Sequence, residues 1–466
     1  GEGRLSQAEA VPRFLPGSPT TPALSATTYN QAGLPFKRQS PLAVQRGDAV
    51  EFEHGLPVPG LLTQVKRVLA GAPIAQQTAW ATSTAHQLRN HFCPQATTSA
   101  EGLVTRTTRD ALCRVTEAAQ PGSPASRLAY GLVGMPNRPT SIIDPRLNTT
   151  RLGYDALGNL SSTAGPEGET TSAVYDRIGR KTRDVNPLLG VTLYEYEGAS
   201  GLVKKMTDPL LRSTHNEYDD NGNLRKRTAP NGQLTEYFYD AANRLVEVRS
   251  IVATAAGPQT VRTRTVYDAL GRVQQTINAN NNASTSSFDN AGNVLARANA
   301  LSQVTRYEYD ADNRVTKVTD AAGRVTETIY DELGRVSSVT TPAGSQGYEY
   351  DGDGRVTRHV DARGNATRYR YDAATGHLVE VIDARGVPTT ATYDEAGNNL
   401  SITDPNGNTT WFEYDKSNRR TKRTDPNGDV WSWEYDKAGN VRFARAPGGL
   451  VVESIYDAAG QLKEQR

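Results

Sequence analysis

The sequence predicts an all-β protein, in which an array of antiparallel hairpins forms one long sheet wound into a hollow spiral shell (a β-cocoon). Three observations carry this prediction. A Tyr-Asp pair recurs about every 21 residues over most of the chain, each repeat holds two Asp-x-x-Gly turns, and the runs between the turns lack a continuous apolar face. Repetition at a fixed period indicates an array of like structural units.

The tyrosines set the period of the array. Tyr-Asp pairs or near variants stand at Tyr154, Tyr175, Tyr196, Tyr218, Tyr239, Tyr267, Phe288, Tyr309, Tyr330, Tyr350, Tyr371, Tyr393, Tyr414, Tyr435 and Tyr456. The intervals are 20 to 22 residues long, apart from one of 28 residues after Tyr239. Because aromatic pairs on neighbouring strands attract, we expect these rings to fall in register and to stack on one another along the sheet.

The turns explain the spacing. In Asp331–Gly334 the aspartate can accept a backbone N–H two residues on, and the fourth position suits a residue with positive φ. Gly334, Gly397 and Gly439 occupy that fourth position. Asn243, Asn313 and Asn418 replace glycine there, as expected for left-handed backbone, which asparagine tolerates next best. One repeat is therefore predicted to be two strands and two turns.

The strands are predicted to be thinly covered on both faces. The runs between turns are about six residues long and rich in Val, Thr and Tyr, which is typical of strands. In Arg314–Asp320 each face receives about one aliphatic side chain. An open sheet of some thirty strands cannot stay flat, because strand twist accumulates with one hand. A spiral wall is favoured over a β-propeller, since odd and even repeats show no alternation.

Composition narrows the function classes. The 466 residues include 52 basic and 51 acidic side chains, a net charge of +1, and 36% hydrophobic residues. The sequence has no basic stripe of the kind that would indicate nucleic-acid binding, and it has no apolar run long enough for a membrane span. Two cysteines, Cys93 and Cys113, leave pairing and compartment open.

The chain is predicted to have three parts. Residues 1–28 form an extended lead-in, residues 29–130 form divergent or capping repeats, and residues 131–466 form the repeat shell, incomplete at its C-terminus. Residues 60–71 fit a short amphipathic helix or a strand. Residues 250–262 lengthen one repeat and are predicted to form an extended hairpin or loop. We expect the chain to be a piece of a longer polypeptide.

The repeat itself resembles a known family. Tyr330–Val336, Tyr393–Leu400 and Thr403–Thr410 are similar to the YD repeat of the Rhs proteins, which also occurs in toxin-complex C components, wall-associated proteins and teneurins. The resemblance covers about residues 100–466. It implies a β-sheet cocoon that encloses a cargo, which in the bacterial polymorphic toxins is the chain's own C-terminal toxin domain.

The resemblance also implies partners and a location. They are the toxin domain, absent here, and a secretion or delivery apparatus, with the protein secreted or at the cell surface. The cleavage segment of the DPxGL type that closes the family's core does not follow Tyr456, and the DPNG runs at Asp404–Gly407 and Asp425–Gly428 look like ordinary turns. The alternative function is cell-surface adhesion or carbohydrate binding, with a glycan as partner.

Candidate reactive residues are few, and we expect no enzyme and no cofactor. Asp219–Asn223 and Asp351–Gly354 faintly resemble calcium loops but lack their ligand pattern. His86, His91 and Cys93 fit no common zinc spacing. The histidines form no catalytic grouping. Trp411, Trp431 and Trp433 cluster one repeat apart and are predicted either to fill the shell interior or to contact a partner.

Overall fold

The computed structural model describes residues 103–254 and 257–466, apart from the side chain of residue 253, together with the backbone of seven earlier strands. Those seven strands are β1 (Ala26–Tyr29), β2 (Pro35–Gln39), β3 (Ala49–Gly55), β4 (Leu61–Leu69), β5 (Ala72–Ile74), β6 (Gln77–Ala79) and β7 (Ala96–Thr98). The predicted lead-in lies outside the described residues up to residue 25. The part boundaries at residues 28 and 130 stay predictions.

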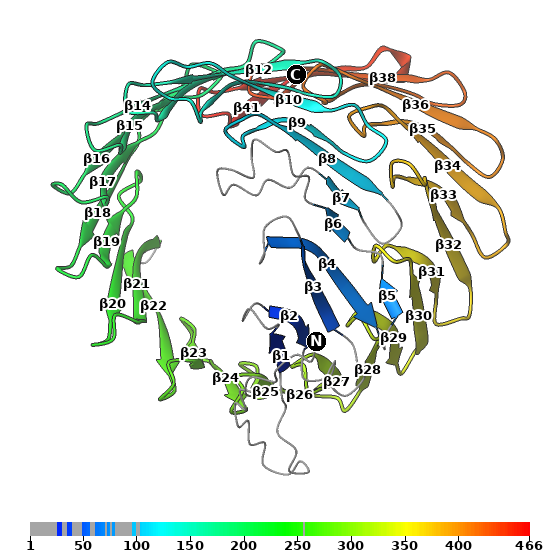
Figure 1. Cartoon of the computed structure of the whole chain (residues 1–466). Helices are drawn as coiled ribbons and strands as arrows, with labels where there is room; N and C mark the ends of the chain where they lie inside the picture. The colour runs from blue at the N-terminus through cyan, green and yellow to red at the C-terminus, as the bar shows by residue number, and fades with distance from the viewer. Residues whose placement is uncertain are drawn as a thin grey trace. The chain divides into compact units, whose positions relative to one another are not determined.

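Strands and tight turns make up the remaining described residues (Figure 1). The strands are β8 (Val104–Arg109), β9 (Val115–Ala119), β10 (Ser126–Tyr130), β11 (Pro139–Ile143), β12 (Thr149–Tyr154), β13 (Leu160–Ala164), β14 (Thr170–Tyr175), β15 (Lys181–Val185), β16 (Val191–Tyr196), β17 (Val203–Thr207), β18 (Ser213–Tyr218), β19 (Leu224–Thr228), β20 (Leu234–Tyr239), β21 (Leu245–Thr254), β22 (Gly257–Tyr267), β23 (Val273–Ile277), β24 (Ala283–Phe288), β25 (Val294–Ala298), β26 (Val304–Tyr309), β27 (Val315–Thr319), β28 (Val325–Tyr330), β29 (Val336–Thr341), β30 (Gly344–Tyr350), β31 (Val356–Val360), β32 (Ala366–Tyr371), β33 (Leu378–Ile382), β34 (Pro388–Tyr393), β35 (Asn399–Thr403), β36 (Thr409–Tyr414), β37 (Arg420–Thr424), β38 (Val430–Tyr435), β39 (Val441–Arg445), β40 (Val451–Tyr456) and β41 (Leu462–Gln465). A 3-10 turn, η1 (Pro447–Gly449), precedes β40.

The strands follow chain order in an antiparallel meander, so the predicted all-β repeat fold is confirmed. The chain divides into two compact units. Unit 1 holds residues 1–127, 287–297 and 303–408, and unit 2 holds residues 128–286, 298–302 and 409–466. Within each unit, a strand ending in the repeat tyrosine pairs with the next strand, and the register shifts by one residue at that tyrosine. Such a bulge adds local twist to the ladder.

The turns have the predicted geometry. In the turn that follows β26, the N–H of Asp310 donates to the carbonyl of Arg314 over 2.9 Å, and the N–H of Asn313 donates to the carbonyl of Asp310 over 3.1 Å. The fourth turn position has positive φ at Gly334 (81°), Gly397 (85°), Gly439 (87°), Asn243 (59°), Asn313 (63°) and Asn418 (59°). The left-handed backbone inferred from the Gly-to-Asn exchanges is therefore confirmed.

Three leucines occupy the same left-handed position, which the sequence did not reveal. Leu147, Leu189 and Leu211 have φ of 65°, 64° and 62°. Each turn keeps its two backbone hydrogen bonds, which hold the leucine in a conformation that residues with a Cβ seldom adopt. In the divergent N-terminal repeats Cys113 takes this place, with φ of 67°. The turn pattern thus tolerates more side chains than Gly and Asn.

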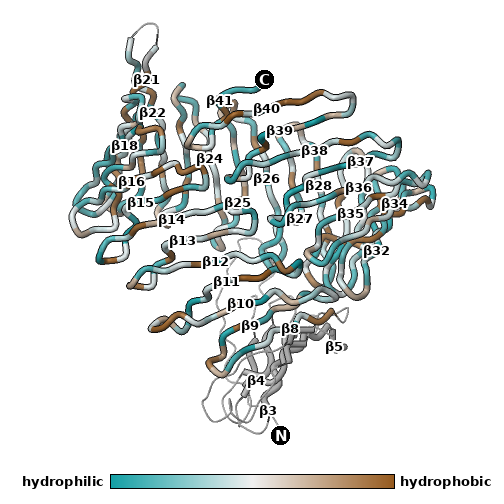
Figure 2. The backbone as a smooth tube through the Cα atoms, turned by 90° about the horizontal axis from the view of Figure 1, so that it is seen from above, coloured by the Kyte–Doolittle hydropathy of each residue, from teal (hydrophilic) through white to brown (hydrophobic). Residues whose placement is uncertain are grey.

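The array has almost no apolar core. In the described part of the chain Phe412 is the one buried hydrophobic side chain, at 8% exposure, beside three buried polar residues, Asn216, Ser401 and Ser454. Apolar and polar positions alternate along the strands without a continuous apolar band (Figure 2). Ladder hydrogen bonds and side-chain contacts between repeats must therefore supply most of the order, as the strand composition predicts.

Two local expectations are resolved. Residues Leu61–Leu69 form strand β4, so the helix alternative for this stretch is wrong and the strand alternative holds. The 28-residue repeat contains the long hairpin β21–β22, as predicted for the insertion.

Cys113 is disulfide-bonded, whereas Cys93 lies outside the described residues. None of the described residues forms a helix long and apolar enough to cross a membrane.

Candidate functional site

Most repeats are held by a turn aspartate and the residue four positions after it. Oδ1 of Asp176 accepts the backbone N–H of Ile178 over 3.0 Å and that of Arg180 over 2.9 Å, and Oδ2 accepts Nε of Arg180 over 2.6 Å. These hydrogen bonds, led by the backbone N–H of Arg180, hold the pKa of Asp176 below its ordinary value. The carboxylate therefore stays ionised and fixes the guanidinium.

The arginine reaches from its own turn to the next repeat. Cζ of Arg180 lies 4.6 Å from the ring centroid of Tyr196, and Nη1 donates to the carbonyl of Gly198 over 2.9 Å. Equivalent pairs at 4.5–4.7 Å are Arg244 with Tyr267, Arg314 with Tyr330, Arg335 with Tyr350, Arg355 with Tyr371, and Arg419 with Tyr435. A planar cation over an aromatic ring is attractive by about 0.5–1 kcal/mol at exposed sites.

The tyrosine hydroxyl completes the connection. Tyr196 donates to the carbonyl of Lys181 over 2.6 Å, and burial raises the pKa of Tyr196, which keeps the hydroxyl protonated. The same bond, 15 residues back and 2.6–3.0 Å long, is made by Tyr154, Tyr175, Tyr218, Tyr239, Tyr309, Tyr330, Tyr371, Tyr393 and Tyr435. Tyr350 and Tyr267 reach back 14 and 22 residues.

The expectation that the tyrosine rings stack on one another is therefore wrong for the repeat tyrosines whose rings have a partner. The partners of the repeat tyrosines are arginines, or at Tyr393 the ring of His377, 4.7 Å away between centroids. His377 occupies the position that arginine holds in other repeats. The sequence contained the missed signal, because arginine recurs directly after the turn glycine. Asparagine takes the same place in other repeats, and Nδ2 of Asn398 bonds Oδ2 of Asp394 over 2.8 Å.

The two faces of the sheet carry different chemistry. Tyr307 faces Val318 across β26 and β27 on one side, which we call the tyrosine face. Glu308 faces Lys317 on the other side, with Nζ and Oε1 3.2 Å apart, which we call the ion-pair face. Cross-strand pairs recur there as Glu195 with Lys205, Glu217 with Lys226, Glu349 with Arg358, Arg370 with Glu380, and Glu413 with Lys422.

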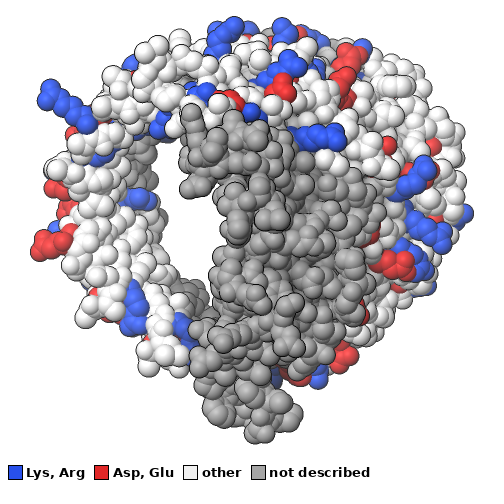
Figure 3. All heavy atoms as spheres, viewed as in Figure 1, with Lys and Arg blue, Asp and Glu red and all other residues white. Residues whose placement is uncertain are grey.

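The ion-pair face carries charges of both signs. Each exposed cross-strand ion pair stabilises by at most about 1 kcal/mol, so the ladder chiefly fixes register and keeps the surface neutral. Basic and acidic side chains are interspersed over the atoms visible in Figure 3.

The three tryptophans do not form one cluster. Trp411 pairs in register with Thr424. It lies two residues before Glu413, so it shares the ion-pair face with Glu413 and Lys422. Trp411 is 55% exposed. Trp431 pairs with Arg423, which itself pairs with Phe412, on the tyrosine face. Trp433 follows Trp431 by two residues and shares its face. Trp411 is thus separated by the sheet from the other two.

A third feature is a set of contacts between turns far apart in the sequence, which we call the seam. In unit 2, Nη1 of Arg146 donates over 2.9 Å to the carbonyl of Asp415 and to Oδ1 of Asn418. Oε1 of Glu169 accepts from the hydroxyl of Ser417 over 2.7 Å. The partners are 248 to 272 residues apart, which is close to twelve or thirteen repeats.

The seam joins two kinds of turn. In each contact, the residue earlier in the sequence lies in a turn that precedes a strand ending in tyrosine. The residue later in the sequence lies in a turn that follows a repeat tyrosine. Nδ2 of Asn186 donates to the carbonyl of Ala458 over 2.8 Å, and a Cβ on Gly190 would overlap that carbonyl oxygen. Unit 1 has a comparable close contact between two distant turns, because a Cβ on Gly122 would lie 2.6 Å from Cγ2 of Thr375. No motif in the sequence marks these pairs.

The aspartates of the two turns that resemble calcium loops are engaged by groups of their own turns. Both carboxylate oxygens of Asp219 are used within its turn, by the backbone N–H groups of Asn221 and Asn223 and by Nδ2 of Asn223. Oδ2 of Asp351 is bound to Arg355. No group of three or more metal-ligating side chains occurs among the described residues. His86, His91 and Cys93 lie outside them.

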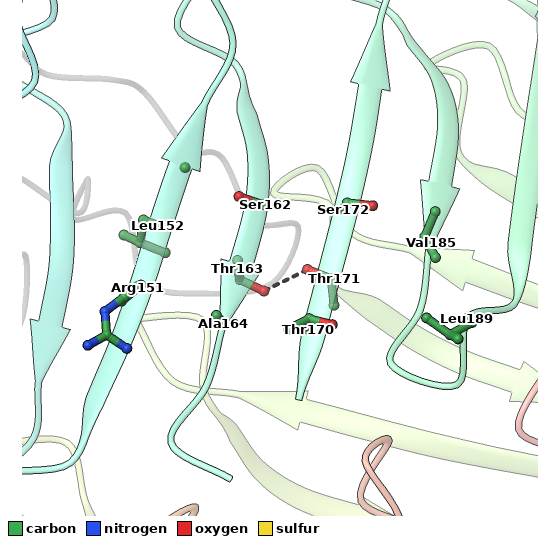
Figure 4. Close-up of a pocket in the computed structure, with 11 residues that line it drawn as sticks. Arg151, Leu152, Ser162, Thr163, Ala164, Thr170, Thr171, Ser172, Val185 and Leu189 are labelled. Carbon is green, nitrogen blue, oxygen red and sulfur yellow. Dashed lines mark hydrogen bonds between the residues drawn. The ribbon is translucent and has the colours of Figure 1, made fainter. Parts of the chain in front are cut away.

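One hollow of about 510 Å³ lies over β12 to β15 (Figure 4). Its lining is mostly Ser, Thr, Ala and aliphatic side chains, and Arg151 is the one ionisable residue in it. The hydroxyls of Thr163 and Thr171 bond each other over 2.6 Å. Without a carboxylate or histidine the hollow lacks a proton donor and acceptor suited to catalysis near neutral pH.

Family comparisons agree with this geometry. The RHS repeat matches residues 218–257, 288–325 and 309–346, and the teneurin YD-shell matches residues 343–465. The chain carries RHS/YD repeats in these residues. The aspartate turns, the tyrosine hydroxyls and the arginines described above are the physical content of its repeats. No curated protein matches this YD-repeat chain in sequence.

Solved structures match the YD-repeat chain in fold. A Photorhabdus luminescens Tc holotoxin pore with a TccC3 mutation is similar with 13% identity and a TM-score of 0.70, over 96% of this chain and 26% of that chain. TcdB2-TccC3 without its hypervariable C-terminal region is similar with 14% identity and a TM-score of 0.65, over 98% and 28%. The YD-repeat chain therefore spans about a quarter of the length of these structures.

Proposed function

We propose that the chain is a wall segment of a shell that encloses a polypeptide cargo. The observation that carries this proposal is the seam. Turns about 250 to 270 residues apart contact each other through Arg146, Asn186 and Gly190, which lets a sheet only one layer thick form a continuous wall. The fold shared with the TcdB2-TccC3 structures supports it, as does the near absence of buried apolar side chains in the described residues.

The cargo we propose is a C-terminal toxin domain of the same polypeptide, delivered by a secretion apparatus from a secreted or surface-exposed protein. The wall itself acts without catalysis. Its role is to exclude proteases and other proteins while the mixed, neutral surfaces of the sheet hold the cargo only weakly. The strands paired on both sides suit this role, because a paired strand offers the cargo no edge to join.

Limited proteolysis of the intact parent protein tests the proposal. We expect the polypeptide that follows this segment to resist protease in the wild type and to be cleaved in Gly190→Trp, where the side chain forces the seam apart. Gly201→Trp is the matched control, because nothing lies within 4 Å of a Cβ at Gly201. Equal cleavage of the following polypeptide in all three proteins would reject enclosure.

Carbohydrate binding is the second candidate. It is favoured by Trp411 alone, whose 55% exposure leaves one ring available to stack on a sugar. Trp431 and Trp433 lie on the opposite face and do not extend that platform. Binding on a glycan array that disappears in Trp411→Ala and persists in Trp431→Ala would support this function, and a blank array would reject it.

A further inference from the structure

The long hairpin β21–β22 projects beyond both of its neighbours in unit 2 (Figure 2). On one side, β20 pairs with β21 only as far as Leu234 with Ile251. On the other side, β23 pairs with β22 only as far as Ile277 with Arg264. The outer backbone edge of β22 before Arg264 therefore faces no strand in the part of the chain that the structure describes.

Exposure confirms that this edge is open. Seven consecutive residues, Pro258 to Arg264, are exposed on both faces of β22. Strands inside the array differ, since β26 alternates between exposed and half-buried residues along its last four positions. An unpaired edge presents free N–H and C=O groups, which other strands can join.

The base of the hairpin holds an unbalanced set of charges. Arg249 and Arg262 are direct cross-strand partners, an arrangement that like charges disfavour. Glu247 holds them together, because its Oε1 accepts from Nε of Arg249 and lies 3.2 Å from Nε of Arg262, while its Oε2 lies 3.5 Å from Nε of Arg264. With Glu236 across from Arg249, three arginines face two glutamates.

On the ion-pair face an acid often lies directly across from a base, as Glu308 does from Lys317, although Arg358 and Arg368 are also direct partners there. Along the row through this hairpin the residues are Lys226, Glu236, Arg249 and Arg262, each the register partner of the next. The position beyond Arg262 is the open edge. An added strand with a carboxylate across from Arg262 would balance the extra positive charge, and Arg264 could reach the same carboxylate diagonally, because the position directly beyond Arg264 is taken by Ile277 of β23.

We propose that the Gln259–Thr263 edge of β22 is a docking site for an extended segment of another protein that carries acidic side chains at alternate positions. The segment adds to the sheet through backbone hydrogen bonds, and Arg262 and Arg264, 45% and 44% exposed, select its carboxylates. The arginines and Pro258 also discourage uncharged strands and further copies of the same hairpin from joining. This docking edge does not depend on whether the wall encloses cargo.

The probe is a capped peptide in which valine and glutamate alternate between terminal threonines. The comparison peptide has the same sequence with lysine in place of each glutamate. We expect fluorescence anisotropy to show about tenfold tighter binding of the glutamate peptide at low salt, because complementary charges separate the two. Arg262→Glu should remove that preference or reverse it, and Arg262→Ala should weaken it. Arg306→Glu is the matched control, because Arg306 is exposed in the fully paired strand β26.

Hydrogen exchange locates the bound peptide. We expect slower exchange in Gln259–Thr263 on adding the glutamate peptide and no such change with a peptide N-methylated at alternate residues, which cannot complete a ladder. Four results would overturn the proposal: equal affinity for the two peptides, unchanged preference in a folded Arg262→Glu variant, protection at another strand, or dimerisation of the protein through this hairpin in light scattering.

Discussion

The guanidinium of Arg314 lies 4.6 Å from the ring centroid of Tyr330, and the hydroxyl of that tyrosine donates over 2.8 Å to the carbonyl of Val315, the residue after the arginine. Asp310 holds the same guanidinium through its Oδ2, 2.7 Å from Nε. One repeat is thereby connected to the next through a side chain, a ring and a backbone group. In a sheet with few buried apolar contacts, this connection accounts for the regular spacing of the Tyr-Asp pairs.

Removing the tyrosine hydroxyl tests this connection. Tyr330→Phe keeps the ring beneath Arg314 but leaves the carbonyl of Val315 without its donor, and we expect a loss of about 0.5–1.5 kcal/mol in unfolding free energy. Urea denaturation followed by hydrogen exchange in β27 and β28 measures it. Tyr307→Phe is the control, since Tyr307 lies on the same face and its hydroxyl has no protein partner among the described residues. Equal losses in the two variants would contradict the assigned role.

The turn glycine offers a second test. Gly334 has a φ of 81°, and a Cβ there would lie 2.8 Å from Nη1 of Arg314. Gly334→Val forces a β-branched residue into left-handed backbone and should cost on the order of 1–3 kcal/mol locally. Gly131→Val provides the comparison, because Gly131 lies outside the positive-φ region and nothing is within 4 Å of a Cβ there. A melting temperature of Gly334→Val equal to wild type would show that the turn is assigned incorrectly.

The seam predicts a purely steric effect. Gly190→Ala places a methyl group against the carbonyl oxygen of Ala458 without requiring an unusual φ. We expect a cost of about 1–3 kcal/mol, as for other overpacked contacts, and faster hydrogen exchange in the turn around Ala458. Gly201→Ala should leave both unchanged, since a Cβ at Gly201 meets open space. Normal exchange around Ala458 in Gly190→Ala would mean that the seam does not form in solution.

The turn carboxylates predict a loss of stability in acid. Hydrogen bonds from the backbone N–H groups of Arg272 and Arg324, and then from their guanidinium groups, hold the pKa values of Asp268 and Asp320 below the ordinary 3.8. A lowered pKa in the folded state stabilises the fold fully above the unfolded pKa, and this contribution disappears as pH falls from about 3.8 through the folded pKa.

Thermal melts from neutral pH downwards measure this dependence. The melting temperature should stay level to about pH 5 and fall steeply below about pH 4, because many turns titrate together. Replacing several turn aspartates such as Asp268 and Asp320 with asparagine should lower the melting temperature at neutral pH and flatten its fall in acid. A wild-type melting temperature that does not change down to pH 2 would contradict this account of the turns.

The sequence predicted the fold to a large extent because its strongest constraint is local. Positive φ at Gly334 and Asn313 follows from which residues tolerate it, and the strands follow from the spacing between turns. The tyrosine spacing predicts rings stacked on rings, whereas in the structure the arginine after the preceding turn binds the ring in many repeats. The left-handed Leu147, Leu189 and Leu211 have no composition signal at all.

The seam and the docking edge were beyond the reach of sequence reasoning for a different reason. Arg146 and Asp415 are 269 residues apart, and nothing in either turn distinguishes it from turns without such a contact. The alignment of Arg249 with Arg262 depends on the register of the long hairpin, which composition does not fix. The tryptophans were grouped by their spacing, although Trp411 and Trp431 belong to opposite faces of the sheet.

A cryo-electron microscopy map of the intact parent protein tests the central claim most directly. We predict a wall one sheet thick around an enclosed volume that holds less ordered polypeptide, with the turn of Arg146 against the turn of Asp415. A solid particle with an apolar centre, or an open sheet in which these two turns are apart, would contradict the account.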